Sequence, residues 1–479
     1  MRFFIFITNY KLITNIQIIL KNMTKEKNNK MEKIVSLCKR RGFIFPASEI
    51  YGGLANSYSY GPYGVELKNN IKQLWWKKFV QERSDMVGMD GPIMLHTKAW
   101  EASGHTSGFN DVMVDCKACK LRFRADYLVE ELTGKDMEGQ LEEMTKVLQE
   151  EKLKCPKCGK SDWTEARNIN MMFKTEMNGV EGDVYLRPET AGAIFLDFKN
   201  ILDSMRVKIP FGIAQIGKAF RNEIVARNFI FRLREFEQME IEYFIDPKMK
   251  WEDLFEEWLK FQEEFAMEIG VKKENMRRYE HTPEKLSHYS KKTIDIEYNF
   301  AFGFGELFGL AHRSDFDLTQ HSKFSNQKLE YTNPQTKEKF IPHVLEPTFG
   351  LDRSILVAID AAYNEEELED GSRVVMKFPK RIAPIKIAVF PLLKNKPELM
   401  IKAKEIFDIL KSDYTCEFDD NGNIGKRYRR QDEIGTPYCL TVDFDSLEKG
   451  DVTIRDRDTM KQDRIRIEEL ANFFQENLK

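Results

Sequence analysis

Arginines, carboxylates and an aromatic residue lie between residues 217 and 244 in an arrangement that could hold a nucleotide. The stretch reads GKAFRNEIVARNFIFRLREFEQMEIEYF, and its two apolar arms around a polar loop predict a long antiparallel hairpin. An arginine such as Arg221 on a rigid strand can hold a phosphate bidentately. Glu223 could accept a hydrogen bond from an exocyclic amine, and Phe236 could stack on a purine. By itself, the pattern also fits an exposed hairpin with cross-strand ion pairs, which is common.

Four of the seven cysteines form two Cys-x-x-Cys pairs, Cys116 with Cys119 and Cys155 with Cys158. Four thiolates suit tetrahedral Zn²⁺ and leave no open position for a catalytic water, so the predicted metal is structural. An odd cysteine count in a large chain argues against a disulfide scaffold. Four buried or redox-active cysteines are the alternative.

The composition limits the possible classes of protein. The chain has 479 residues, which suggests roughly three domains. Hydrophobic residues make up 42% and charged residues 32%, too much apolar material for a disordered chain. With 74 basic and 77 acidic residues, a nucleic-acid surface has to be a local patch. No run is apolar enough for a membrane span, so we expect no membrane partner.

The elements that must position these residues follow from periodicity. Apolar residues at helical spacing predict an amphipathic helix over 64–80, most simply a core helix. Residues 126–152 are charged and helix-prone, 184–245 are dense in strand-like runs, and a helix is expected from Trp251 to Trp258. The apolar face of the helix at 64–80 contains Ile71, Leu74, Trp75 and Phe79. That of the helix from Trp251 contains Trp251, Leu254, Phe255 and Trp258.

The pattern of predicted strands and helices changes near residue 380, where we expect a domain boundary. Strands are predicted at 385–390, 438–443 and 452–455, and a terminal helix at 467–477. A further helix is expected to present one apolar face, formed by Met400, Ala403, Phe407 and Leu410. This alternation predicts a compact α/β module.

The polar hairpin resembles motif 2 of the class II aminoacyl-tRNA synthetases. The helix at 64–80, followed by Pro92, is similar to motif 1, the dimer-interface element of the class, and Glu346-Pro-Thr-Phe-Gly-Leu-Asp-Arg353 to motif 3. Four more segments resemble the family of homodimeric glycyl-tRNA synthetases: Trp100-Glu-Ala-Ser-Gly-His105, Leu186-Arg-Pro-Glu-Thr190, Glu235-Phe-Glu-Gln-Met-Glu240 and Ala311-His-Arg-Ser-Asp-Phe-Asp-Leu318. The tail, with Gly425-Lys-Arg-Tyr-Arg-Arg430 and Val452-Thr-Ile-Arg-Asp-Arg457, is similar to the anticodon-binding domain of that family.

The resemblance implies an α+β fold with three parts. These are a class II core with an antiparallel sheet flanked by helices at 31–380, a zinc-binding insertion at 110–170 within it, and an α/β anticodon-binding domain at 381–479. Residues 1–30 are expected to be an N-terminal extension. Thr8, Asn9 and Lys11 interrupt the apolar run that a secretory signal needs, and a mitochondrial presequence should contain more Arg and Ser. We favour a misassigned start or an upstream extension, and a cytoplasmic protein, with organellar targeting as the alternative.

The activity implied by the resemblance is that of a glycine–tRNA ligase. Glycine would be activated with ATP and Mg²⁺ to glycyl-adenylate and transferred to the 3′ end of tRNA(Gly) by a homodimer with structural Zn²⁺. Arg221 would hold the α-phosphate, Arg353 the terminal phosphate and Glu306 a magnesium–phosphate contact, with further charge from Arg313. ATP is expected against Arg221, Asn222, Glu223, Phe231, Arg232, Arg234, Glu235, Phe236, Glu306, Leu307, Gly350, Leu351, Asp352 and Arg353. Glycine is expected against Arg124, Glu189, Phe236, Glu237, Gln238, Met239, Glu240, Glu346, Thr348 and Gly350.

Two other functions compete with this one. A class II synthetase for another amino acid is disfavoured by the acidic set Glu189, Glu240 and Glu346. A catalytically inactive, nucleic-acid-binding accessory protein should have lost Arg221 and Arg353, which are present.

The chain also departs from the family's usual pattern at three places. Thr348 replaces a serine, Gly192 stands where a glutamine is usual, and Ala226-Arg227 lacks a proline. In the tail, phosphate and anticodon contacts are expected from Lys426, Arg427, Arg429, Arg430, Arg455 and Arg457.

Overall fold

The computed structural model describes residues 29–134, 141–223, 228–287, 289–369 and 371–478. Residues 1–28 of the expected N-terminal extension and the Ala226-Arg227 dipeptide therefore lie outside the described residues. No helix within these ranges is long and apolar enough to cross a membrane.

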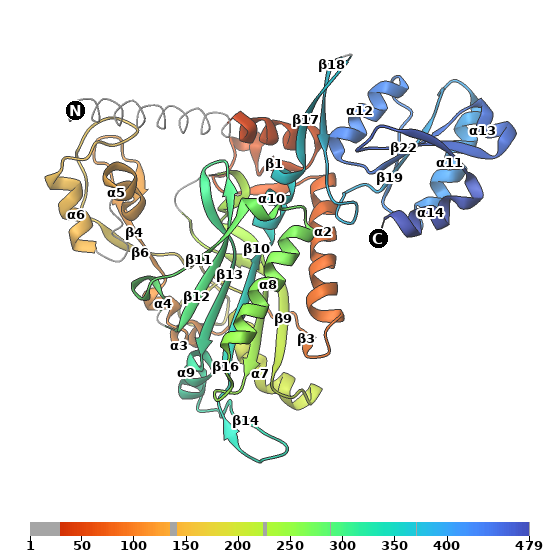
Figure 1. Ribbon diagram of the computed structural model, residues 1–479. Coiled ribbons are helices and arrows are strands. Elements are labelled where there is room, and N and C mark those ends of the chain that lie inside the picture. Colours follow the sequence, from red (N-terminus) through yellow and green to blue (C-terminus); the bar gives the residue numbers. More distant parts are fainter. Residues whose placement is uncertain (1–28, 135–140, 224–227, 288, 370, 479) are drawn as a thin grey trace, which may run out of the picture.

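A seven-stranded sheet forms the centre of the molecule (Figure 1). Its order is β11-β12-β13-β16-β10-β9-β3, and all neighbours are antiparallel except the edge pair β3 and β9. The strands are β3 (Met86–Gly88), β9 (Phe211–Phe220), β10 (Glu235–Ile245), β11 (Met276–Glu280), β12 (Lys292–Phe300), β13 (Gly303–Ser314) and β16 (His343–Gly350). The predicted hairpin is confirmed, since β9 and β10 pair antiparallel along their length.

Helices cover both faces of this sheet because its strands alternate apolar side chains between the two sides. Ile241 and Phe349 belong to one core cluster with α2 (Pro62–Trp76), α8 (Glu252–Glu268) and α10 (Leu351–Ala362). Ile213 and Phe244 belong to another with α7 (Ala191–Met205) and α9 (Phe316–Ser325). The expectations of helices at 64–80 and from Trp251 are confirmed. A π-helical turn, Lys77–Gln81, continues α2.

One sequence expectation needs correction here. Residues 191–205, within the stretch expected to be dense in strands, form α7, because a short apolar run does not distinguish a buried helix from a strand. The interpretation of 64–80 as a core helix is confirmed, since Ile71, Trp75 and Phe79 are buried in the chain's own core, while Val65 on α2 is 39% exposed.

The cysteine-bearing insertion builds a small core of its own. A three-stranded sheet, β5-β4-β6, packs with two helices around Val114, Leu128, Leu148 and Trp163. Its elements are β4 (Asn110–Asp115), β5 (Arg122–Arg124), α5 (Ala125–Thr133), α6 (Leu141–Glu150) and β6 (Arg167–Asn170). Charged, helix-prone residues do form α5 and α6 there.

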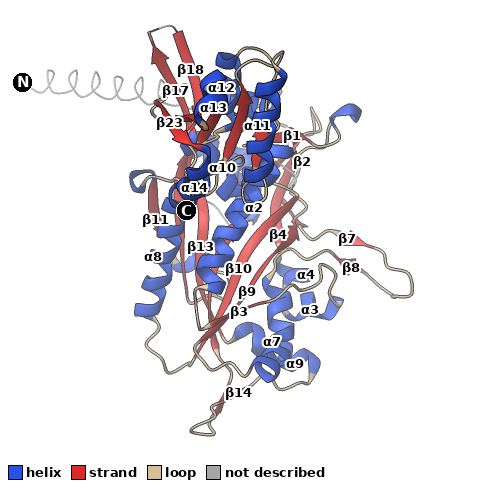
Figure 2. Cartoon of the chain, turned by 90° about the vertical axis from the view of Figure 1, so that its right-hand side faces the viewer, coloured by secondary structure: helices blue, strands red, loops and turns tan. Residues whose placement is uncertain are grey.

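The C-terminal module lies on the other side of the central sheet from the insertion (Figure 1) and faces the viewer in Figure 2. It has a five-stranded sheet in the order β20-β19-β21-β22-β23, and the predicted alternation of strands and helices is confirmed. Its elements are β19 (Ile387–Pro391), α11 (Pro397–Leu410), β20 (Cys416–Phe418), α12 (Ile424–Ile434), β21 (Tyr438–Val442), α13 (Phe444–Lys449), β22 (Asp451–Asp456), β23 (Gln462–Arg466) and α14 (Leu470–Asn477). The predicted apolar face of α11 is confirmed at Ala403 and Leu410 only. The other buried positions are Leu399 and Ile406, whereas Met400 and Phe407 lie at the edge of the buried face.

Shorter elements connect these parts. They are β1 (Ile44–Pro46), β2 (Tyr58–Tyr60), α3 (Thr97–Ala102), α4 (His105–Gly108), β7 (Lys174–Thr175), β8 (Val184–Tyr185), β14 (Tyr331–Thr332), β15 (Lys339–Phe340), β17 (Tyr363–Leu368) and β18 (Gly371–Met376). The β17–β18 hairpin joins the module to the core through Arg373, whose Nη1 donates to Asp432 Oδ2 on α12 at 3.1 Å.

Candidate active site

A cavity of about 360 Å³ lies on the central sheet and is lined by residues of both expected sets. Strands β10, β12, β13 and β16 all contribute lining residues, and so does the N-terminus of α10. Of the expected residues, the cavity is lined by Arg124, Glu189, Arg221, Glu223, Phe231, Arg232, Phe236, Glu237, Gln238, Glu240, Glu306, Glu346, Thr348, Gly350, Asp352 and Arg353. The structure thus brings together residues that lie up to 229 positions apart, from Arg124 to Arg353.

The other expected residues do not line this cavity. Met239, Leu307 and Leu351 are buried in the apolar core. Glu235 is exposed and pairs with Lys218. The remaining three, which are Asn222, Arg234 and Arg313, lie next to the cavity-lining residues.

Asn222 and Arg234 help to hold the polypeptide around the cavity. The Asn222 backbone N–H donates to the Met171 carbonyl at 2.7 Å. Arg234 Nε donates to the Glu223 carbonyl at 2.8 Å, next to the segment 224–227.

The cationic end of the cavity contains Arg221 and Arg353. The Arg221 guanidinium lies 5.3 Å from the ring centre of Phe236, and its Nε donates to the Pro188 carbonyl at 3.1 Å. Arg353 Nη1 lies 2.9 Å from Glu306 Oε2, and this neighbouring cation lowers the pKa of Glu306. Two arginines over one cavity match the charge of a polyphosphate.

Asp295 lines the same end and was not anticipated from the sequence. Its Oδ2 lies 2.8 Å from His281 Nε2. Burial, opposed by this hydrogen bond, raises the pKa of Asp295 to about 6. The signal was present in the alternation of residues 292–300, where Thr293, Asp295 and Glu297 share the face opposite Ile294 and Ile296.

Three buried glutamates form the acidic end. Glu240 accepts hydrogen bonds from the Thr190 hydroxyl, from Thr348 Oγ1 at 3.2 Å and from Gln238 Nε2 at 3.4 Å. Glu189 Oε2 lies 3.4 Å from His105 Nε2. Burial opposes ionisation of Glu189, but His105, together with the positive charges of Arg313 and Arg221, outweighs it and holds the pKa of Glu189 at about 2.

Arg313 lies beneath the acidic end instead of in the cavity. Its Nε and Nη2 donate to Asp317 at 2.8 and 2.9 Å, and its Nη1 donates to Glu346 Oε1 at 2.6 Å. Its charge therefore reaches the cavity through Glu346. Even so, burial, reinforced by Glu240 and Glu189, raises the pKa of Glu346 to about 8.

Gly192, where the family usually has glutamine, packs against Trp100. A Cβ added there would lie 3.0 and 3.1 Å from two ring atoms of Trp100. A side chain at residue 192 would therefore have to displace Trp100, and Gly192 is not among the cavity-lining residues.

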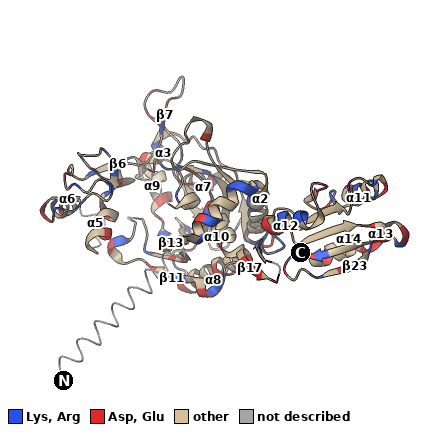
Figure 3. Ribbon diagram, turned by 90° about the horizontal axis from the view of Figure 1, so that it is seen from above, with Lys and Arg blue, Asp and Glu red and all other residues tan. Residues whose placement is uncertain are grey.

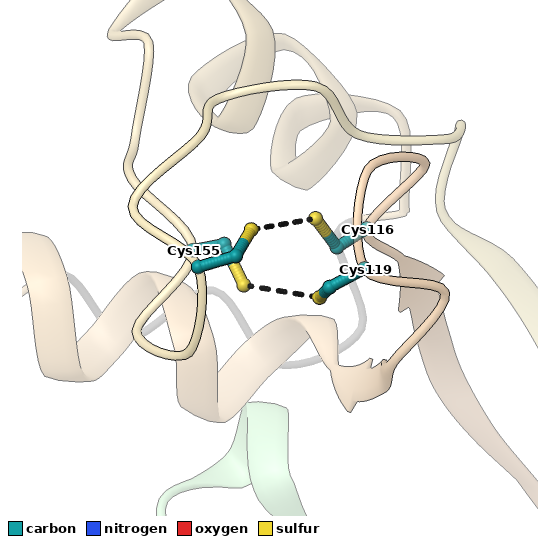
Figure 4. Close-up of side chains that lie close together, drawn as sticks. Cys116, Cys119 and Cys155 are labelled. Atoms are coloured by element: carbon teal, nitrogen blue, oxygen red, sulfur yellow. Dashed lines mark hydrogen bonds between the residues drawn. The ribbon is translucent and has the colours of Figure 1, made fainter.

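The four cysteines of the insertion converge on one point (Figure 4). Cys116 Sγ lies 3.6 Å from Cys158 Sγ, and Cys119 Sγ lies 3.8 Å from Cys155 Sγ. A tetrahedron with Zn–S bonds of about 2.3 Å has edges of about 3.8 Å, so these distances fit zinc. Each pair sits on a matching turn, with Lys120 N–H donating to the Cys116 carbonyl and Gly159 N–H to the Cys155 carbonyl.

The insertion reaches the cavity through Arg124. The guanidinium stacks 4.2 Å from the ring centre of Tyr127, and its Nη1 lies 3.0 Å from Asp111 Oδ1. Tyr127 Oη in turn accepts from Arg232 Nη2 at 3.1 Å. Folding of the insertion therefore affects two residues of the cavity wall.

The expected anticodon cations divide into two groups. Arg427, Arg455 and Arg457 are buried, and they bond to backbone carbonyls or to buried carboxylates such as Asp432. The expectation that these three contact RNA is therefore wrong. Lys426 and Arg429 are exposed on α12, where Figure 3 shows basic residues, and Arg430 pairs with Asp419 at 2.6 Å.

Comparison with known proteins follows the same division of the chain. Residues 173–362 match the tRNA synthetase class II core domain (G, H, P, S and T), and residues 386–477 match the anticodon binding domain. A glycine–tRNA ligase of Acetivibrio thermocellus is 53% identical over 457 residues, covering 93% of this chain and 98% of that protein. Those of Caldanaerobacter subterraneus and Bacillus cereus are 52% and 50% identical, each covering 94% of this chain and 98% and 99% of the relatives. The chain belongs to the glycine–tRNA ligase family of class II tRNA synthetases.

Proposed function

We propose that this chain activates glycine with ATP to glycyl-adenylate and transfers the glycyl group to the 3′ end of tRNA(Gly). The observation that carries the proposal is a single cavity with Arg221 and Arg353 at one end and three buried glutamates at the other. Glycine carries an ammonium group and ATP a triphosphate. The glutamates attract the ammonium group of glycine, and the arginines attract the triphosphate of ATP.

The activation step needs in-line positioning and positive charge more than acid–base chemistry. The glycine carboxylate attacks the α-phosphorus, the bond to the β-phosphate oxygen breaks, and pyrophosphate leaves. Arg221 stabilises the charge on the α-phosphate, and Arg353 orients the terminal phosphate. Phe236 stacks on adenine, and Glu223 accepts from its amine.

Metal ions have two places in this proposal. Class II synthetases use Mg²⁺, and Glu306 and Asp295 would hold it here through the carboxylates that it prefers. When bound, it would supply positive charge against the phosphates. Zn²⁺ would be held by Cys116, Cys119, Cys155 and Cys158 and would stabilise the insertion.

The direct test is ATP–pyrophosphate exchange with glycine, run beside alanine and serine. We expect glycine to support exchange far better than either competitor. Exchange with another amino acid instead would identify a different class II synthetase. No exchange with any amino acid, together with RNA binding, would favour the accessory-protein alternative.

Thr348 offers a test of specificity. Its hydroxyl donates a hydrogen bond to Glu240 Oε1 at 3.2 Å, while its methyl group occupies space at the acidic end. A pocket rejects larger ligands by overpacking, which costs about 1–3 kcal/mol. We expect Thr348→Gly to raise alanine activation relative to glycine by about tenfold.

The matched control is Thr348→Ser, which removes the methyl group and keeps the hydroxyl. We expect Thr348→Ser to shift the alanine-to-glycine ratio of kcat/KM and to leave the KM for glycine unchanged. Thr348→Gly, which also removes the hydroxyl, should raise that KM. If neither variant changes the ratio, Thr348 does not limit the size of the amino acid.

The pH dependence of the KM for glycine follows from Glu346. The pKa of this group is about 8 in the ligand-free site, so below that pH a proton competes with the ammonium. The KM for glycine should fall as the pH rises from about 6.5 to about 8.5, by at most tenfold per unit. Initial-rate exchange in overlapping buffers measures this, with Glu346→Gln as the control that should remove the slope. A flat wild-type profile would show that Glu346 is already ionised in the empty site.

Recognition of tRNA is assigned to the exposed side of α12. We expect the double variant Lys426→Ala/Arg429→Ala to lower tRNA charging by about tenfold through KM, since each phosphate contact adds affinity that depends on salt. Glycine-dependent exchange should not change, because both residues lie outside the cavity. Equal tRNA affinity of the double variant and wild type at low salt would remove this assignment.

The remaining proposals concern organisation. We propose domains at 31–380 and 381–479 with an insertion at 110–170, in line with core clusters that run to Ala383 and then start at Ile387. We also propose a cytoplasmic homodimer. Support for a second copy comes from the turn between β1 and β2, where Ile50 and Tyr51 are 88% and 87% exposed.

A further inference from the structure

Glu242 is a buried acid that the proposed chemistry does not use. It follows Glu240 by two positions on β10, so both side chains leave the same face of the sheet. Its exposed fraction is 0%, and neither carboxyl oxygen has a hydrogen-bond partner among the described residues. A buried, unpaired carboxylate is costly, so this group needs an explanation.

Its neighbours are also acids. The pairing of β10 with β16, in which Glu240 lies opposite Thr348 and Tyr243 opposite Leu345, places Glu242 across from Glu346. One carboxyl oxygen from each of Glu240, Glu242 and Glu346 lies within 4.8 Å of the others. Like charges directly across a strand pair destabilise it, so three ionised carboxylates cannot share this space.

The hydrogen-bond partners identify which acid keeps its proton to the highest pH. Glu240 accepts from Thr190 and Thr348, and Glu346 accepts from Arg313, so both have donors that favour the charged form. Glu242 has none among the described residues. It is also absent from the cavity wall, so the glycine ammonium does not reach it.

We propose that Glu242 is a neutral carboxylic acid that acts as a positioning residue, holding Glu346 in place for the ammonium of glycine. This inference rests on the proposed function. The neutral acid presents its O–H to the carboxylate opposite, one oxygen of which lies within 4.8 Å, as no ionised carboxylate can. It thereby allows Glu346 and Glu240 to lie close together in an empty site.

The electrostatic surroundings agree with this assignment. The charged groups that face Glu242 are Glu346 on β16, Glu240 on β10, Arg313 on β13 and Asp317 on α9. Arg313 is shared with Asp317 and Glu346, and so it cannot compensate a further negative charge. Burial and the Glu346 carboxylate raise the pKa of Glu242 well above its usual range.

Infrared difference spectroscopy of the full chain tests the protonation state without relying on activity. A neutral carboxylic acid has a carbonyl stretch separate from carboxylate bands. We expect the difference spectrum of wild type minus Glu242→Gln to contain this carbonyl band at about pH 8.5, which is above the pKa of about 8 for Glu346. The band should persist in Glu346→Gln. Its absence from wild type, or its survival in Glu242→Gln, would overturn the proposal.

Kinetics test the positioning role. Glutamine has the shape and donor capacity of the neutral acid, so Glu242→Gln should keep the KM for glycine within about threefold of wild type. Glu242→Leu should raise this KM at least about tenfold, with a smaller change in kcat. The matched control, Glu240→Gln, removes an ionised partner of the ammonium and should raise KM in spite of the same chemical change.

Two kinetic outcomes would contradict the inference. If Glu242→Gln raised KM as much as Glu240→Gln, Glu242 would act as a charge. If added K⁺ or Mg²⁺ lowered the KM for glycine in wild type but not in Glu242→Gln, the three carboxylates would be a cation site. If wild type does not exchange pyrophosphate with glycine, the proposed function fails, while the infrared result still decides the state of Glu242.

Discussion

Replacing Arg221 by alanine should lower glycine-dependent pyrophosphate exchange by about 10²–10³-fold. The loss of one preorganised group that stabilises developing charge costs about 2.7–4 kcal/mol. Because Arg221 would meet charge that builds up on the α-phosphate, the loss should appear mainly in kcat. Arg353→Ala should also impair exchange, with a larger share of the effect in the KM for ATP.

The fold should tolerate Arg221→Ala. The side chain lines the cavity and donates to the Pro188 carbonyl, a contact of about 1 kcal/mol. Arg466→Ala, at a side chain that is 68% exposed in the C-terminal module, is the matched control and should leave exchange unchanged. Near-normal exchange in Arg221→Ala at an unaltered melting temperature would remove Arg221 from the phosphate site.

Cys116→Ser should release the metal and unfold the insertion. Structural zinc sites contribute about 10–16 kcal/mol of apparent binding free energy, which stabilises the surrounding fold. Cys116 and Cys155 belong to the small core of the insertion, so this core should open when the site is lost. Metal analysis of protein purified without chelator and limited proteolysis around residues 110–170 measure the two effects.

The control for this variant is Cys416→Ser, at a half-buried cysteine outside the four-sulfur cluster. It should retain zinc and resist cleavage as wild type does. In Cys116→Ser, we also expect a higher KM for ATP, because Arg124 and Tyr127 connect the insertion to the cavity wall. Wild-type protein without zinc would show that the four thiols serve another purpose.

Local patterns in the sequence were sufficient for the elements and for the chemistry of the site. Helical spacing of Ile71, Trp75 and Phe79 predicts α2, and two apolar arms around a polar loop predict the β9–β10 hairpin, because both depend on neighbouring residues only. The two Cys-x-x-Cys pairs likewise predicted a four-sulfur cluster. Even here, the apolar run at 191–205 was ambiguous, and tertiary packing made it a helix.

What a charged side chain does was decided by the tertiary structure. Arg455 and Arg429 look alike in the sequence, yet one pairs with buried Asp432 and the other is exposed on α12. Glu240 and Glu242 differ by two positions on one strand. Glu240 has donors and lines the cavity, whereas Glu242 does not line it and has no donor in the part of the chain that the structure describes. The partners of these groups come from strands and helices distant in the chain. The free energy of a charge depends on its burial and on those partners, which no local pattern specifies.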